Sequence, residues 1–314
     1  MDFAARDLMY LLGAVLLAAA GGEAFLKAIL GAAAHLRVPR ALAATTLAAF
    51  ATSSPELTVS TVAALSGNPE IGLGNALGSN VVNIAFIFGL ALLFGAIRSA
   101  RKDFGRDFLL ALTVPLLTLA FALDGRIGRG EGALLIALFV VWLVVVVRMA
   151  LRHRDAVADT PPPYAGPGPW LTLTLGILGF GALVAAGRLF VQGAAGLAVA
   201  LEIDTYIVGV LLVSIGTTMP ELVTVLLSRL RGHDDIGVGT LIGSNIFNGL
   251  AIVGLASVIH PIAVPAAEIA LTLVGGTAAL LLLPPDHRGL IPRWRGPLLL
   301  LLYGGFVWAT LTAN

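Results

Sequence analysis

An internal repeat constrains this chain more than any other feature of its sequence. When the sequence is compared with itself at a shift of 165 residues, residues 51–90 align with residues 216–255 without a gap, and sixteen of the forty positions are identical. Chance matches in apolar sequence fall on Leu or Ala, whereas most of these fall on Thr, Pro, Glu, Gly, Ser and Asn. The repeat predicts two related halves. In the first half the identical positions are Thr52, Pro55, Glu56, Leu57, Leu65, Gly67, Ile71, Gly72, Gly74, Gly78, Ser79, Asn80, Asn83, Ile87, Gly89 and Leu90.

The composition places both halves in a membrane. Of the 314 residues 58% are hydrophobic and 12% are charged, with a mean hydropathy of +0.96, whereas soluble domains carry about 25% charged residues. The net charge of +1 indicates no nucleic-acid partner. There is no cysteine, which excludes disulfides, thiolate metal sites and cysteine nucleophiles. Only Lys27 and Lys102 are lysines among 19 basic residues. This preference for arginine is typical of GC-rich coding and favours a bacterial source, so a bacterial inner membrane is the expected location.

Apolar stretches of the length needed to span a bilayer, roughly 20 residues, recur along the whole chain. Bounded by charges or by Pro and Gly clusters, they predict an all-α polytopic membrane protein with ten transmembrane helices. The expected helices cover residues 8–34, 41–66, 71–97, 107–123, 130–150, 170–198, 205–229, 236–259, 266–283 and 296–312.

The basic residues predict the orientation of these helices. With the N-terminus outside, the expected inner loops hold 14 Lys and Arg residues and the outer side holds 3, and cytoplasmic loops carry the excess of positive charge. Both termini are therefore expected outside. Residues 152–169 become a cytoplasmic linker, because their prolines and charges disfavour a helix. The linker separates a first half, 1–151, from a second, 170–314.

Each half is expected to contain five helices. Because five is odd, the second half must enter the membrane upside down relative to the first. Inverted repeats are a common plan of secondary transporters, whose sites lie near the bilayer midplane on interrupted helices. In both halves the polar residues concentrate on the second and third expected helix.

The second helix of each half carries a proline and a glutamate in an apolar run. Thr52 and Glu56 are four residues apart and share a helix face, and Pro55 has no N–H to offer the carbonyl of Ala51. In the second half Thr217, Glu221, Pro220 and the carbonyl of Gly216 repeat this arrangement. A freed carbonyl within a membrane is tolerated only where protein, water or an ion satisfies it. Each Pro-Glu pair thus predicts a bend and an anionic ligand.

The third helix of each half adds hydroxyl and amide groups at helical spacing. The combined set of expected ligands contains only hard oxygen donors, which Ca²⁺ prefers and Na⁺ accepts. No histidine lies inside an expected helix, which argues against a transition metal. Two carboxylates balance one divalent cation, and sodium ions or protons must replace it when it leaves. The side chains are Thr52, Ser53, Glu56, Ser79, Asn83, Thr217, Thr218, Glu221, Ser244 and Asn248.

Structural explanations compete with this interpretation. A lone proline in a membrane helix is usually a kink, and Ser, Thr and Gly mostly serve packing. A charge at the helix centre, however, costs about 2.5–3.5 kcal/mol and marks a pathway. Other charges favour structural roles: an ion pair or snorkelling for Glu23 and Arg188, a solvated turn over a metal site for residues 233–235, and solvated charges for Glu202 and Asp204.

Two other functional classes stay open at this stage. A passive cation channel would use similar oxygens, but it would line a pore through oligomer symmetry, and the inverted repeat favours alternating access. A membrane enzyme would need a nucleophile with a base, or histidine metal ligands, and the expected helices contain no histidine for either. We expect no enzyme, no cofactor and no obligatory protein partner.

The paired motifs resemble a known family. The segments "ATSSPE" and "GNALGSNVVN", within residues 49–90, and "GTTMPE" and "GTLIGSNIFN", within residues 214–255, look like the two alpha-repeats of the calcium/cation antiporter superfamily, which includes the sodium/calcium exchangers. The resemblance implies four cation sites between helices 2, 3, 7 and 8, with Glu56 and Glu221 as the main Ca²⁺ ligands. It also implies that the carbonyls of Ala49 and Ser214 serve outer sodium sites, that helices 1 and 6 slide across this core, and that three Na⁺ exchange for one Ca²⁺.

The departures from the family pattern bear on the coupling ion. Ala51 stands where the family usually has Gly, and Thr218 where it often has Ser; both changes are mild. Potassium-dependent relatives carry Asp at the position of Asn248, and proton-coupled relatives carry an acidic residue and a histidine in helices 3 and 8. Since this chain has neither feature, the resemblance favours Ca²⁺/Na⁺ exchange, with Ca²⁺/H⁺ exchange as the alternative.

Overall fold

The computed structural model describes residues 3–99, 101–156, 167–200, 208–264 and 266–312. The described chain is almost entirely helical, as expected, and each of the ten expected helices overlaps helical residues, although 205–207 lie outside the described part. The helices are α1 (Phe3–Leu36), α2 (Arg40–Ala43), η1 (Ala44–Ala48), α3 (Ala49–Thr52), α4 (Ser54–Leu65), α5 (Pro69–Val81), η2 (Val82–Phe88), α6 (Gly89–Leu93), α7 (Arg101–Phe121), η3 (Ala122–Asp124), α8 (Arg129–Ala156), α9 (Pro169–Ala200), η4 (Val208–Val213), α11 (Ser214–Thr217), α12 (Met219–Leu230), α13 (Asp234–Ile246), η5 (Phe247–Ile252), α14 (Val253–Ile259), α15 (Ala266–Leu281) and α16 (Arg295–Thr312).

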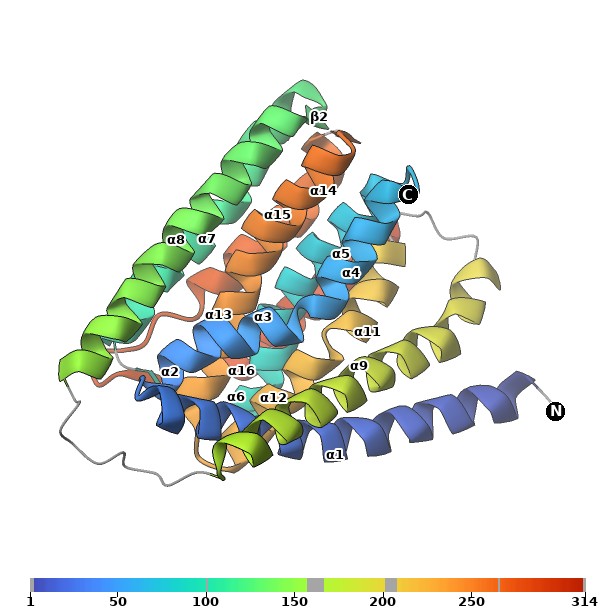
Figure 1. The fold of residues 1–314 in the computed structure, drawn as a ribbon. Helices are drawn as coiled ribbons and strands as arrows, with labels where there is room; N and C mark the ends of the chain where they lie inside the picture. Colours follow the sequence, from blue (N-terminus) through green and yellow to red (C-terminus); the bar gives the residue numbers. More distant parts are fainter. Residues whose placement is uncertain (1–2, 100, 157–166, 201–207, 265, 313–314) are drawn as a thin grey trace.

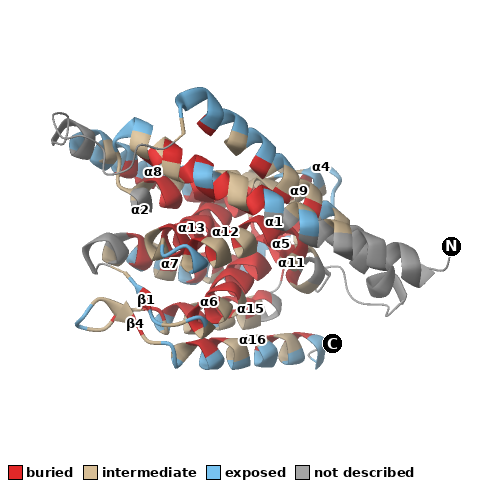
Figure 2. Ribbon diagram, turned by 90° about the horizontal axis from the view of Figure 1, so that it is seen from below, coloured by how far each residue is buried: buried red, intermediate tan, exposed pale blue. Residues whose placement is uncertain are grey.

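Apolar side chains cover the outer helices of the molecule as well as its core, and many polar side chains are buried. By length and mean hydropathy, five stretches of the described residues could cross a membrane: 69–93, 107–124, 129–152, 169–186 and 234–259. The first and last are central, with 83% and 78% of their apolar window buried, whereas α8 is peripheral at 17% (Figure 2). Large apolar side chains on the outer helices are exposed, which suits a lipid environment; they include Leu134, Val140, Val141, Trp170, Ile177, Leu178, Leu301 and Trp308.

The two halves meet at the centre of the bundle through α5 and α13. The side-chain amide of Asn80 donates to the carbonyl of Asn245, and that of Asn245 donates to the carbonyl of Asn80, both at 3.3 Å. A Cβ at Gly78 would collide with the carbonyl oxygen of Val210, and one at Gly243 with that of Thr45. These contacts are related by the same shift of 165 residues as the sequence repeat, so each half packs against the other in the same way.

Four two-residue strands, which the sequence analysis did not predict, also join the halves. Strand β1 (Ile97–Arg98) pairs antiparallel with β4 (Leu290–Ile291), and β2 (Arg126–Ile127) pairs antiparallel with β3 (Ile262–Ala263). A shift of 165 carries Ile97 onto Ile262 and Arg126 onto Ile291. Each half therefore pairs its connections with those of the other half.

Helices α1 and α9 lie side by side across one face of the bundle (Figure 1). They approach closely at Gly21 and Gly179, where an added Cβ would lie 2.8 Å from the carbonyl oxygen of the other glycine, as small residues allow. Glu23 of α1 forms ion pairs with Lys27 at 3.4 Å and with Arg231 at 2.9 Å. The expected structural ion pair for Glu23 is confirmed, and its repeat counterpart Arg188 is exposed.

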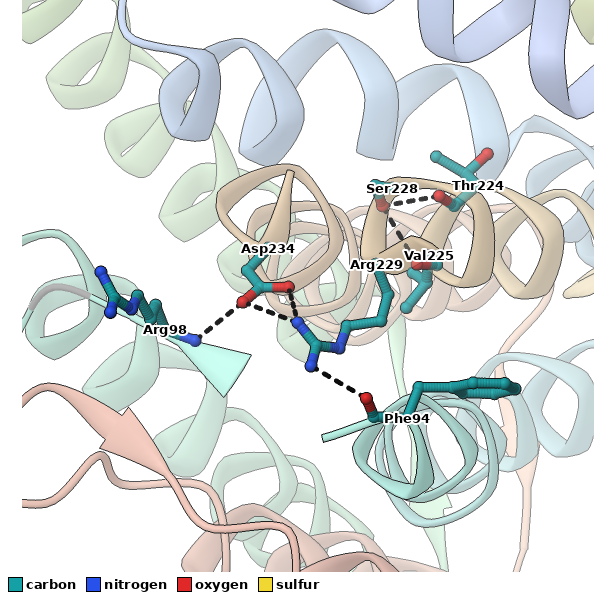
Figure 3. Close-up of polar contacts among 7 residues, drawn as sticks. All are labelled: Phe94, Arg98, Thr224, Val225, Ser228, Arg229 and Asp234. Atoms are coloured by element: carbon teal, nitrogen blue, oxygen red, sulfur yellow. Dashed lines mark hydrogen bonds and ion pairs between the residues drawn. The ribbon is translucent and has the colours of Figure 1, made fainter. Parts of the chain in front are cut away.

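A half-buried ion pair fixes the turn between α12 and α13 (Figure 3). The guanidinium of Arg229 contacts the carboxylate of Asp234 at 2.9 Å and donates to the carbonyl of Phe94, and the backbone amide of Arg98 donates to the same carboxylate. The two side chains are 18% and 13% exposed. The expectation of a solvated turn at residues 233–235 is therefore wrong for Asp234, because its charge is used to hold the α6–α7 connection.

The close approach of the halves gives a first prediction. Gly78→Ala and Gly243→Ala should each lower the free energy of unfolding by about 1–3 kcal/mol, because the added methyl meets backbone atoms that cannot rotate away. Gly304→Ala in α16 is the control, since nothing lies within 4 Å of its Cβ position, and it should gain up to about 1 kcal/mol of helix propensity. Thermal unfolding in detergent measures all three. Equal unfolding temperatures for Gly78→Ala and Gly304→Ala would contradict the contact.

The Arg229–Asp234 ion pair gives a second prediction. Arg229→Met should lower the free energy of unfolding by about 1–3 kcal/mol, because it leaves a half-buried carboxylate without its charged donor. Arg126→Met is the matched control: Arg126 and Asp124 form a 3.9 Å pair with 72% and 63% of their side chains exposed, and exposed pairs contribute little. The unfolding temperature should fall for Arg229→Met alone. A similar fall in both variants would show that the Arg229–Asp234 pair does not stabilise the turn between α12 and α13.

Candidate cation-binding site

The Pro-Glu pairs begin new helices. The helix breaks between α3 and α4 at Ser53, with φ −83° and ψ 6°, and between α11 and α12 at Thr218, with φ −80° and ψ 7°. Pro55 and Pro220 occupy the first turns of α4 and α12, where a missing N–H costs nothing. The glutamates follow directly, in a turn whose free N–H groups favour negative charge.

One expectation about these breaks is wrong. Pro55 was expected to leave the carbonyl of Ala51 without a donor, but a backbone N–H at the Ser53 cap donates to it. The irregular backbone at the break supplies a shorter-range bond in place of the one that proline cannot form. Ala51 therefore contributes no free carbonyl in this structure.

The two glutamates are fully buried and meet at the centre of the molecule. The Oε1 atom of Glu221 accepts hydrogen bonds from Ser244, at 3.1 Å, and from Ser53 of the other half, at 3.2 Å. The Oε1 atom of Glu56 accepts a longer bond of 3.5 Å from Ser79. The two carboxylates are close enough to repel one another. The structure thus brings both glutamates into one cluster.

Two threonines each lie beside the glutamate of the opposite half. Thr52 lies beside the carboxylate of Glu221, and Thr217 lies beside that of Glu56. Both threonines are buried, and Thr218 is buried behind them. Each carboxylate is therefore surrounded by hydroxyls from its own half and from the other.

Several buried oxygens of this cluster have no hydrogen-bond donor among the described residues. A buried polar atom without a partner costs about 1–3 kcal/mol, and four such oxygens on the helices of the cluster would suit a bound cation. Asn83 donates from Nδ2 to Asn245 at 3.0 Å, which leaves its Oδ1 free, and Asn248 has no partner for either amide atom. The oxygens concerned are Oε2 of Glu56, Oε2 of Glu221, Oδ1 of Asn83 and Oδ1 of Asn248.

The two backbone carbonyls that the resemblance assigned to sodium are engaged in hydrogen bonds. The carbonyl of Ala49 accepts from the amide of Ser53 at 2.9 Å, and that of Ser214 accepts from the amide of Thr218 at 3.0 Å and from its hydroxyl at 2.7 Å. The hydroxyl of Ser214 donates to the carbonyl of Val210. A role for Ala49 and Ser214 as ligands stays a prediction.

A cavity of about 380 Å³ lies next to the cluster. Its lining includes Pro55 of α4, Phe180 and Arg188 of α9, Thr217 of α11 and Pro220 of α12. Helix α9 therefore borders a cavity that also contacts both helix breaks.

Sequence reasoning missed three asparagines that organise the site. Asn80 and Asn245 are identical in the repeat alignment, which was a usable signal, and they hold the central helices together. Asn75 is buried and accepts a hydrogen bond from Thr217; its repeat counterpart is Thr240, so the alignment held no signal for it. The charges at Glu202 and Asp204 lie outside the described residues.

Cation binding at this cluster can be tested directly. Calcium at a hundred times its dissociation constant should stabilise the purified protein by about 2.7 kcal/mol, seen as a higher unfolding temperature. Glu56→Gln and Glu221→Gln should each lose most of this shift, because they remove half of the negative charge at the site. Glu70→Gln, on α5 outside the cluster, should keep it. A full calcium shift in both cluster variants would place the binding elsewhere.

Comparison with known proteins identifies the family of this chain. The family model described as sodium/calcium exchanger protein matches residues 7–148 and again residues 171–312. CaxA of Alkalimonas amylolytica is 34% identical over 287 residues, covering 87% of this chain and 89% of its own. The sodium/calcium exchanger MaX1 of Methanosarcina acetivorans is 27% identical, covering 96% and 97%.

The fold also matches a solved exchanger. A structure of the sodium-calcium exchanger NCX_Mj, soaked with Na⁺ and Sr²⁺, superposes with a TM-score of 0.78 at 26% identity and covers 98% of both chains. The family match covers both halves of the chain. The two buried carboxylates, the oxygen groups around them and the exposed apolar outer helices are consistent with it. This chain is an integral membrane protein that belongs to the sodium/calcium exchanger protein family.

Proposed function

We propose that the protein exchanges Ca²⁺ for Na⁺ across the membrane by alternating access. The observation that carries this proposal is the pairing of two buried glutamates, each beside a hydroxyl of the opposite half. The transported cation binds near the midplane, between the breaks at Ser53 and Thr218 and the helices α5 and α13. Glu56 and Glu221 supply the charge, and the hydroxyls and amides around them complete the coordination.

We infer that the ten helical spans form two inverted five-helix repeats. The support is the reciprocal contact of equivalent groups: Asn80 with Asn245, Gly78 with Val210, and Gly243 with Thr45. In this arrangement residues 1–151 and 170–314 are the repeats and 152–169 link them in the cytoplasm. Both termini then face outward, and a bacterial inner membrane is the location that the basic residues favour.

Alternating access requires a part that moves against the site. Helices α1 and α9 suit this role, because they pack closely on each other at Gly21 and Gly179 and meet the core on one face. Helix α9 also borders the cavity beside Thr217 and Pro220. A slide of the α1–α9 pair would expose the cluster on one side and cover it on the other.

The charge of the site explains why transport would be coupled. Two carboxylates neutralise one Ca²⁺, and buried charge without a partner is costly. When calcium leaves, other cations must enter before the site can be covered again. Sodium fits the hydroxyl and amide oxygens that remain, and the family resemblance implies three Na⁺ per Ca²⁺. Asn248, an amide in place of an acid, offers no extra site for a proton.

Flux into proteoliposomes tests the function. Vesicles loaded with Na⁺ and diluted into sodium-free medium should take up radioactive Ca²⁺, whereas dilution into sodium-matched medium should give none. Glu56→Gln and Glu221→Gln should lower uptake at least tenfold, because each removes a charge that offsets the desolvation of Ca²⁺. Glu70→Gln should transport normally.

A parallel arm with a proton gradient and no sodium separates the coupling ions. Uptake driven by protons alone would replace sodium with H⁺ in this proposal. Calcium leak without any gradient would indicate a channel. No calcium flux in either arm would remove calcium as the substrate.

A further inference from the structure

Asn75 connects three parts of the site without being one of its expected ligands. It lies in α5, is fully buried, and donates from Nδ2 to the carbonyl of Glu56 and to the hydroxyl of Ser60, both at 3.4 Å. Its Oδ1 accepts the hydroxyl proton of Thr217 at 3.0 Å. One side chain thus touches α4 and α11, on the two sides of the glutamate cluster.

The bond from Thr217 matters because a hydroxyl has a single proton. When that proton points at a cation, the hydroxyl dipole opposes binding; when it points away, the oxygen lone pairs are free to coordinate. Asn75 attracts the proton of Thr217 to the side of α5. The other acceptors near this hydroxyl are the carboxylate of Glu56 and the carbonyl of Ser214, which is farther away than Asn75 at 3.3 Å and already accepts two bonds from Thr218.

The other half of the molecule lacks this device. Thr52, the counterpart of Thr217, donates to the carbonyl of Ala49 at 3.4 Å and lies beside the carboxylate of Glu221, with no asparagine partner among the described residues. The counterpart of Asn75 is Thr240, which is buried and whose hydroxyl has no partner among the described residues. The two threonines beside the carboxylates are therefore held differently, although the backbone around them repeats.

We propose that Asn75 is a positioning residue for cation binding: it holds the proton of Thr217 away from the site, so that the Thr217 oxygen is available as a ligand beside Glu56. This inference rests on the proposed function. The consequence is that the Thr217 side binds the cation through a fixed hydroxyl, and the Thr52 side through one that must reorient.

A double-mutant cycle in proteoliposomes tests this role. Asn75→Leu should raise the calcium concentration for half-maximal uptake about three- to tenfold, the effect of one net hydrogen bond, and should leave the maximal rate nearly unchanged. Thr217→Val should raise it at least as much. In the Thr217→Val background, Asn75→Leu should have no further effect, because the group on which Asn75 acts is gone.

Two controls separate this role from a structural one. Ser60→Ala removes another partner of Asn75 and should leave half-maximal calcium unchanged, as should Thr240→Val at the equivalent position of the second half. If Asn75→Leu does not fold, Asn75→Thr, the residue found in the second half, replaces it in the cycle. The calcium-induced rise in unfolding temperature gives the same comparison without transport.

The possible outcomes are distinct. Equal effects of Asn75→Leu with and without the Thr217 hydroxyl, or a loss of maximal rate without a change in half-maximal calcium, would overturn the positioning role and leave the exchanger function intact. A wild-type protein that neither transports calcium nor is stabilised by it would overturn both.

Discussion

Two carboxylates buried together in a membrane protein are the interaction on which the rest of this structure depends. Their burial is unfavourable unless donors and cations compensate for it, and their mutual repulsion adds to the cost. The surrounding features all reduce that cost. The helices begin a new turn just before Glu56 and Glu221, serine hydroxyls donate to both, and glycines allow the backbones that carry these groups to approach. In the proposed function a cation supplies what the protein leaves uncompensated, so that binding adds to the stability of the fold.

The sequence predicted the parts of this fold that depend on local pattern. Apolar runs located the helices to within a few residues, and the alignment of 51–90 with 216–255 identified Glu56 and Glu221 as equivalent. It did not predict contacts between residues far apart in the chain. The strands pair segments from different halves. Asp234 binds Arg229 and also the backbone amide of Arg98 in the α6–α7 connection. Asn75 reaches Thr217 only when α5 packs on α11. Such contacts have no periodicity to reveal them.

The repeat is close in its backbone and incomplete in its side chains. Helix breaks, π-helical turns and strands recur at a shift of 165 residues. At the same shift, however, Asn75 aligns with Thr240 and Glu23 aligns with Arg188. The repeat does not conserve the ion pair of Glu23 with Arg231, because the equivalent residues are Arg188 and Ser66. A symmetric backbone makes two equivalent arrangements geometrically available, and the unequal side chains give them different energies.

The pairing of β1 with β4 and of β2 with β3 has a consequence for biosynthesis. Strand β1 belongs to the first half, and its partner at Leu290–Ile291 is synthesised only after most of the second half. The first half must therefore wait in the membrane with its buried glutamate and its edge strands unpaired until most of the second half has been inserted. Completion of the glutamate cluster and closure of the two short sheets therefore both depend on the second half.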